Sequence, residues 1–159
     1  MDKRIIQDLK NTWRNVNQAT IGFANSVPSA NWSSRPFAPR FKAFAWEFAC
    51  LTRTRMCYLK ALRTGILKFS PQEDILDKQT LLNFPKNEIV TQLQKLAREI
   101  LSEITKIDSP QSVKLIYWLF QHERLHHGKL ILYHSQAGFK LPKSFVKTWG
   151  ESNFIKAQK

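Results

Sequence analysis

The sequence has little of what marks several protein classes. Its 159 residues include only 5 glycines and 7 prolines, which excludes collagen-like and Pro/Gly-rich low-complexity chains. No uncharged apolar run approaches the roughly 18 residues that a membrane span needs. The first ten residues, MDKRIIQDLK, lack the apolar core of a secretion signal. We therefore expect a cytoplasmic protein that makes no use of a membrane.

Cysteine and acidic residues are also scarce. Cys50 and Cys57 are seven residues apart, so within one helix they would lie about 10 Å apart, too far for a disulfide. Lys and Arg total 25 against 12 Asp and Glu, a formal net charge of +13, and the excess is largest in residues 35–68. Such a surface attracts nucleic acid or anionic small molecules, although no nucleic-acid-binding motif accompanies the charge.

Apolar residues recur at steps of three and four through much of the chain, and no long alternation of period two indicates a sheet. The fourth helical segment has the clearest limits, since Ser109 can cap its start, Pro110 fits its first turn and Gly138 can end it. We predict an all-α fold, a four-helix bundle in one domain over residues 1–150, followed by a basic tail at 151–159. The predicted helices span residues 3–25, 41–64, 86–106 and 110–137, with a loop at 26–40 and a long connection at 66–85.

All four histidines lie in the fourth predicted helix. His122 and His126 are four residues apart, so their rings share one face, and two neutral imidazoles at this spacing can bind one divalent transition metal. The alternative is that one is a core residue and the others lie on the surface. His127 should point away from the pair by about 100°, and His134 should support the site from behind or be exposed.

Residues 122–126 also match the HExxH pattern of zinc peptidases, in which the glutamate acts as general base. The extended form of that motif is absent, because Lys129 and Leu132 occupy its later glycine and histidine positions. We therefore expect Glu123 to be an exposed or rim residue, with peptidase activity as a minor alternative.

Residues 121–130 (QHERLHHGKL), followed by Tyr133, Gly138 and Pro142, resemble the last helix of the DinB-like superfamily. That superfamily includes the YfiT-like proteins and the bacillithiol- or mycothiol-dependent transferases. The segment from Trp46 to the pairs Tyr58-Leu59 and Ala61-Leu62 is similar to its second helix. The resemblance covers nearly the whole chain and implies a four-helix bundle with a long connection between helices 2 and 3, often a homodimer, with three histidines around one metal ion.

The resemblance carries two of these ligands onto His122 and His126. The third family histidine comes from the second helix, but here no histidine precedes His122. Aligning the segments on Tyr58 puts Cys50 in that place, with Glu47 one turn earlier. A thiolate or a carboxylate can ligate zinc, whereas a cysteine can also be a plain buried residue.

The resemblance implies a metal-dependent enzyme, a thiol transferase or hydrolase acting on a small molecule. A bound Zn or Ni ion with an open position would lower the pKa of a bound thiol or water. Arg53 or Arg55 could hold an anionic low-molecular-weight thiol. No residue is assigned a catalytic role.

The alternative is a non-catalytic bundle with a degenerate metal site. It would bind an anionic partner such as nucleic acid through residues 35–68, with Trp32, Phe37 and Phe41 stacking on bases. We favour these aromatic side chains as anchors of the loop on the core.

Overall fold

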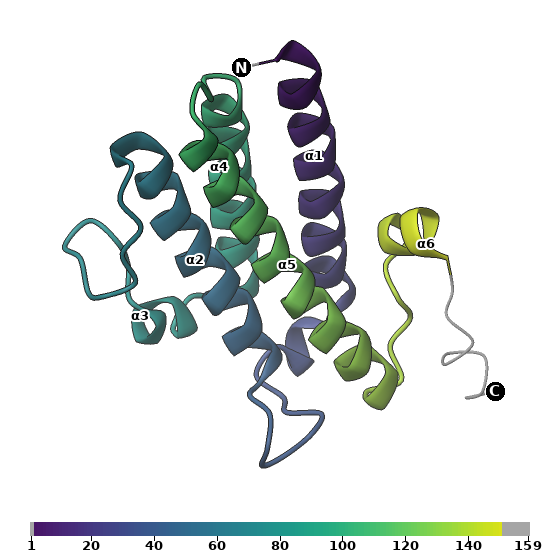
Figure 1. The fold of residues 1–159 in the computed structure, drawn as a ribbon. Coiled ribbons are helices and arrows are strands. Elements are labelled where there is room, and N and C mark those ends of the chain that lie inside the picture. The colour runs from purple at the N-terminus through teal and green to yellow at the C-terminus, as the bar shows by residue number, and fades with distance from the viewer. Residues whose placement is uncertain (1, 151–159) are drawn as a thin grey trace.

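The computed structural model describes residues 2–150, and in this range the chain forms helices and no strand (Figure 1). The prediction of an all-α protein is confirmed, and the four predicted helices are present within three residues of their expected limits. Three short helical segments were not predicted. The predicted basic tail, residues 151–159, lies outside the described residues. The elements are α1 (Lys3–Ser26), η1 (Ser29–Asn31), α2 (Phe44–Thr64), α3 (Lys78–Leu82), α4 (Lys86–Ile104), α5 (Pro110–Gln136) and α6 (Lys143–Trp149).

The four long helices pack together, with α1 and α2 each in contact with both α4 and α5. Their apolar stripes meet in two clusters of buried side chains, one around Trp13, Ile100 and Leu119 and the other around Phe23, Phe48 and Leu93. Burying large apolar side chains of this kind contributes about 1.5–3 kcal/mol each. None of the helices among residues 2–150 is long and apolar enough to cross a membrane.

The helix ends follow the sequence signals. The Ser109 hydroxyl accepts a hydrogen bond from the Ser112 backbone N–H at 3.2 Å, and Pro110 follows in the first turn of α5. Gly65 ends α2 with φ 75°, and Gly138 follows α5 with φ 70°. Both are left-handed conformations that favour glycine.

The short helices α3 and α6 pack on the outside of the long ones. α3 interrupts the connection between α2 and α4 and lies against α2, while α6 lies against α1 (Figure 1). Gly22 makes the second contact possible, because a Cβ there would lie 2.4 Å from the Ser144 hydroxyl and 2.8 Å from the Pro142 Cβ. Helices of five and seven residues carry too little periodicity to be recognised in a sequence.

Candidate metal centre

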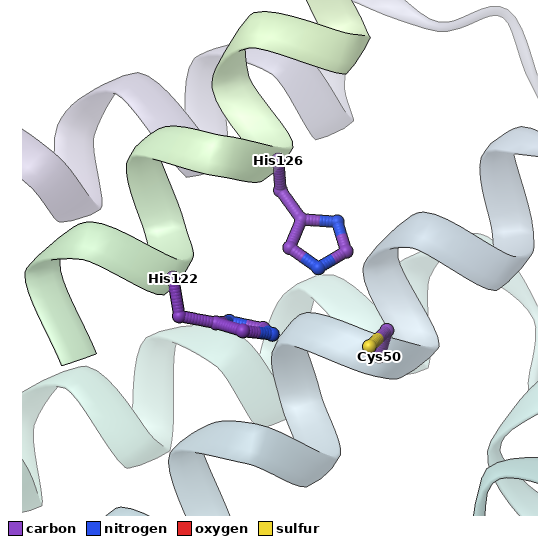
Figure 2. A group of neighbouring side chains, drawn as sticks. All are labelled: Cys50, His122 and His126. Atoms are coloured by element: carbon purple, nitrogen blue, oxygen red, sulfur yellow. The ribbon is translucent and has the colours of Figure 1, made fainter. Parts of the chain in front are cut away.

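Three potential metal ligands converge where α2 faces α5. His122 and His126 lie one turn apart on α5, with ring centroids 4.6 Å apart, and Cys50 faces them from α2 (Figure 2). One sulfur and one nitrogen from each imidazole all lie within 4.8 Å of one another. The expectation that both histidines face into the helix packing, with Cys50 opposite, is confirmed as geometry.

The donor set suits a divalent transition metal. One thiolate and two imidazoles are ligands that zinc, nickel and copper accept, and three protein ligands leave one position of a tetrahedral site open. With bond lengths of about 2.0–2.3 Å, ligand atoms in such a site lie about 3.5 Å apart. Binding an ion would therefore require the side chains to close by about 1 Å, a change that rotamer adjustment can supply.

Glu47 lies behind His126 and is not one of the converging donors. Its Oε2 accepts a hydrogen bond from His126 Nδ1 at 2.6 Å, and its Oε1 accepts one from the Tyr133 hydroxyl at 3.1 Å. The carboxylate is almost completely buried, with 1% of its residue exposed. Glu47 thus has the place of a carboxylate that orients a ligand histidine, which leaves Nε2 of His126 free to bind an ion.

The environment favours the thiolate form of Cys50. Burial raises the pKa of its thiol, but hydrogen bonds with His122 and His126 and the charges of His126 and Lys78 outweigh burial and lower it to about 6. The pKa of His126 moves the other way: burial lowers it, but interactions with Cys50 and Glu47 raise it above its ordinary value. A thiolate is the form in which cysteine binds metals and attacks electrophiles.

His122 is the least constrained of the three side chains. It is half-buried, and its Nε2 lies 3.4 Å from the Thr54 hydroxyl, at the far limit of a hydrogen bond. Its Nδ1 is buried and has no hydrogen-bond partner among the described residues. A buried ring nitrogen without a hydrogen-bond partner lowers the stability of the fold. Of the three side chains, His122 would therefore gain the most from binding a metal ion or another ligand.

Arg55 does not have the role predicted for it. We expected it to bind an anion, but its side chain is completely buried. Its Nε and Nη2 donate to the two oxygens of Glu123 at 2.8 and 2.9 Å, and its Nη1 donates to Asn17 Oδ1 and the Leu93 carbonyl, both at 2.8 Å. The guanidinium therefore has no free face for an external anion.

Glu123 was expected at the surface, and this prediction is also wrong. The residue is 0% exposed, and besides Arg55 it accepts a hydrogen bond from the Thr20 hydroxyl of α1 at 2.5 Å. Burial raises the pKa of Glu123, but the charge and hydrogen bonds of Arg55 lower it to about 2. A carboxylate held in this way cannot act as the general base of a peptidase, so the HExxH interpretation fails despite the matching letters.

The other two histidines lie away from the converging donors. His127 points away from the pair, as predicted, and its Nε2 lies 2.7 Å from the Thr20 hydroxyl of α1. His134 is 0% exposed, so the alternative of an exposed residue is wrong, and its ring nitrogens lie 2.7 Å from the Leu130 carbonyl and 2.8 Å from the Ser26 hydroxyl. Neither histidine can share an ion with Cys50 without leaving these partners.

Arg53, the other predicted anion-binding residue, faces the connection that follows α2. Its Nη2 donates to the Phe69 carbonyl at 2.7 Å. Two lysines instead lie near the donors: Lys129 Nζ is 3.6 Å from Glu47 Oε2, and the charge of Lys78 makes a minor contribution to the lowered pKa of Cys50. Lys129 lies three residues after His126 on the same helix, a spacing that could have identified it from the sequence. Lys78 could not be identified in this way, because it lies in α3, a helix too short to show periodicity.

Cys57 and Cys50 are both free cysteines, in agreement with the expectation from their spacing. Compared with known proteins, the sequence matches no family model and no curated protein.

Proposed function

We propose that the protein is a DinB-like, metal-dependent helical bundle in which Cys50, His122 and His126 hold one divalent ion, zinc or nickel. The observation that carries this proposal is the convergence of the three donor atoms from α2 and α5 to within 4.8 Å. The carboxylate of Glu47, which fixes the ring of His126 from behind, supports it further.

A divalent ion with an open coordination position would supply Lewis acidity and lower the pKa of a thiol or water that binds there. The chain's own residues prepare this position. Glu47 keeps the Nδ1–H of His126 engaged, so that Nε2 points to the site, and the neighbouring imidazoles keep Cys50 as a thiolate. The resemblance to DinB-like proteins makes thiol transfer or hydrolysis on a small molecule the reaction we propose, with a low-molecular-weight thiol as the co-substrate and a homodimer as the assembly.

Metal content tests this proposal directly. The protein would be purified without an affinity tag and its zinc and nickel measured by mass spectrometry, in the parent chain and in Cys50→Ser, His126→Ala and Cys57→Ser. Cys57→Ser is the matched control, since Cys57 lies two turns along the same helix, away from the histidines. We expect about one equivalent in the parent and the control, and a loss of at least tenfold in the other two.

Two results would contradict the proposal. Parent protein that stays metal-free even with added Zn²⁺ or Ni²⁺ would remove the metal site. Equal metal content in Cys50→Ser and Cys57→Ser would remove Cys50 from the ligand set.

A second candidate function uses the same side chains without a metal. Cys50, His126 and Glu47 lie in the order nucleophile, base and orienting carboxylate. In acyl transfer, the Cys50 thiolate would attack the substrate carbonyl carbon, and the departing group would take the proton held by His126. Water or another nucleophile would then give its proton to His126 and take the acyl group from Cys50, which restores the thiolate. The two candidates differ in one measurement: Zn²⁺ should protect Cys50 from iodoacetamide if the three residues are ligands, and should not slow alkylation if they are not.

The alternative of a non-catalytic, nucleic-acid-binding bundle is weakened by two features. Arg55 is removed from the basic surface by its buried ion pair. Trp32, which was to stack on a base, is only 6% exposed and lies against Phe48, with ring centroids 4.9 Å apart. Binding of DNA or RNA that weakens steeply with salt would restore this alternative.

A further inference from the structure

A half-buried tryptophan beside the converging donors lies close to two lysines. Trp46 is on α2, one turn before Cys50. The Nζ of Lys78, from α3, lies 4.5 Å from the centroid of its ring, and the Nζ of Lys129, from α5, lies 5.8 Å from it. Three helices thus bring two ammonium groups to one aromatic side chain.

Both ammonium groups act on the donor group. Lys129 lies one turn after His126, and its Nζ is 3.6 Å from Glu47 Oε2. Lys78 contacts the ring of Trp46, one turn before Cys50, and its positive charge is the weakest of the influences that lower the pKa of the Cys50 thiol. The two lysines therefore lie near the cluster through Trp46 and Glu47, and Cys50 and His122 are the members of the cluster that are only half-buried.

The positive charges of Lys78 and Lys129 are not fully balanced by nearby carboxylates. Among the described residues, no carboxylate lies within ion-pair distance of Lys78, and Lys129 reaches only Glu47, which is already bound by His126 and Tyr133. Two ammonium groups that share one aromatic neighbour raise the local positive potential, which attracts anions. An anionic group that binds beside these ammonium groups would gain charge-assisted hydrogen bonds, and Trp46 would supply apolar contact for the rest of the molecule.

We propose that Lys78, Lys129 and Trp46 form an anion subsite that binds the carboxylate or phosphate of a small molecule and directs its reactive end to Cys50, His122 and His126. The inference rests on the proposed function, in which that cluster is the reaction centre. It replaces Arg53 and Arg55 with two lysines from other helices as the residues that recognise the anion.

A pair of alkylating reagents tests the subsite. Iodoacetate and iodoacetamide have nearly the same size and react in the same way: the Cys50 thiolate attacks the methylene carbon, a C–S bond forms and iodide leaves. They differ in charge, so the ratio of their rates reports attraction of an anion, while any change in the amount of thiolate cancels. All measurements would be made in the Cys57→Ser background, so that Cys50 is the only thiol.

We expect the iodoacetate-to-iodoacetamide ratio at Cys50 to exceed that of a free thiol such as N-acetylcysteine amide. Lys78→Gln and Lys129→Gln should each lower it by about two- to fivefold, as expected for partly exposed charges, and added salt should lower it as well. Lys60→Gln is the control, because that lysine is paired with Asp74 at 2.6 Å. A ratio that neither substitution changes would overturn the subsite.

Two protecting ligands distinguish the anionic groups. Benzoate and phenyl phosphate each carry one anionic group on a planar apolar ring, so the one that better slows alkylation by iodoacetamide identifies the preferred group. Protection that disappears in the double lysine variant supports the subsite, and protection that persists there overturns it. Metal analysis decides the proposed function separately: a metal-binding protein without charge selectivity refutes only the subsite, and a charge-selective protein without metal refutes only the metal centre.

Discussion

Two polar clusters on α5 are adjacent in sequence but differ in how completely they are paired. His122 and His126 face α2, while Glu123 and His127 face the interior between α1 and α2. In the Glu123 cluster, both carboxylate oxygens are held by Arg55, and Thr20 links the carboxylate to His127. In the His122 cluster, one buried ring nitrogen has no partner among the described residues, and Cys50 and His122 are only half-buried.

The difference separates a structural role from a binding role. A buried ion pair whose donors and acceptors are all engaged has nothing left to offer a ligand, and its loss is felt in stability. A cluster with an unpaired nitrogen, a thiolate and partial exposure has unused bonding capacity. The HExxH motif contains Glu123, which has the structural role, and His122 and His126, which have the binding role. The motif alone therefore does not identify the reactive side chains.

The largest expected effect belongs to the fully paired cluster. Glu123→Gln should lower the free energy of unfolding by about 3–5 kcal/mol, because it leaves the charge of Arg55 buried without a counter-ion. Urea denaturation at pH 7 would measure this. The double variant Arg55→Met/Glu123→Met should recover much of the lost free energy of unfolding, because it buries no charge. If the double variant is no more stable than Glu123→Gln, the ion pair is not what holds this region together.

A smaller effect concerns the pH dependence of stability through His127. Burial lowers the pKa of His127 most, and the nearby arginines add to this, so that it falls to about 4. Between about pH 6.5 and pH 4 the unfolded chain binds a proton that the folded one does not, so stability should fall by about 1–3 kcal/mol as pH decreases through this range.

Thermal or urea unfolding between pH 7 and 4 checks this slope, and His127→Gln should reduce it. His134, whose pKa burial also lowers to about 4, keeps its own contribution in that variant. An NMR titration that shows His127 protonated above pH 6 would contradict the lowered pKa of this buried histidine.

The third prediction concerns the incompletely paired cluster. Glu47→Gln should lower metal affinity by about 10–100-fold, because a neutral amide polarises and orients His126 less than a carboxylate does. Competition with a chromophoric chelator would measure it. Glu99→Gln, which removes a carboxylate paired with Arg63 at the surface, is the control and should leave metal affinity unchanged. Equal affinities in the two variants would contradict the supporting role of Glu47.

The sequence was sufficient to predict the four long helices and part of the cluster, but not η1, α3 or α6. Steps of three and four locate a helix and its apolar stripe, and a spacing of four residues places His122 and His126 on one face whatever α5 packs against. The position of Cys50 came from alignment on Tyr58 rather than from periodicity. The metal, the reaction and the dimer remain predictions.

The ion pair between Arg55 and Glu123 could not be predicted, because the two residues are 68 positions apart in the sequence. Periodicity shows which residues share a face but not which other helix that face meets. α5 carries apolar side chains around most of its circumference, including the exposed Trp118, Leu125 and Leu132, so its buried sides were not evident. The position of Lys78 beside Trp46 could not be predicted for a related reason. It depends on how the connection after α2 folds back against that helix.

The ion pair between Arg55 and Glu123 also has a geometric consequence for its neighbours. Successive residues of a helix differ by about 100° in direction, so fixing Glu123 against α2 sets the rotation of α5 about its own axis. That rotation decides where His122 and His126 point. The direction in which the two imidazoles point therefore depends on an ion pair in which neither of them takes part.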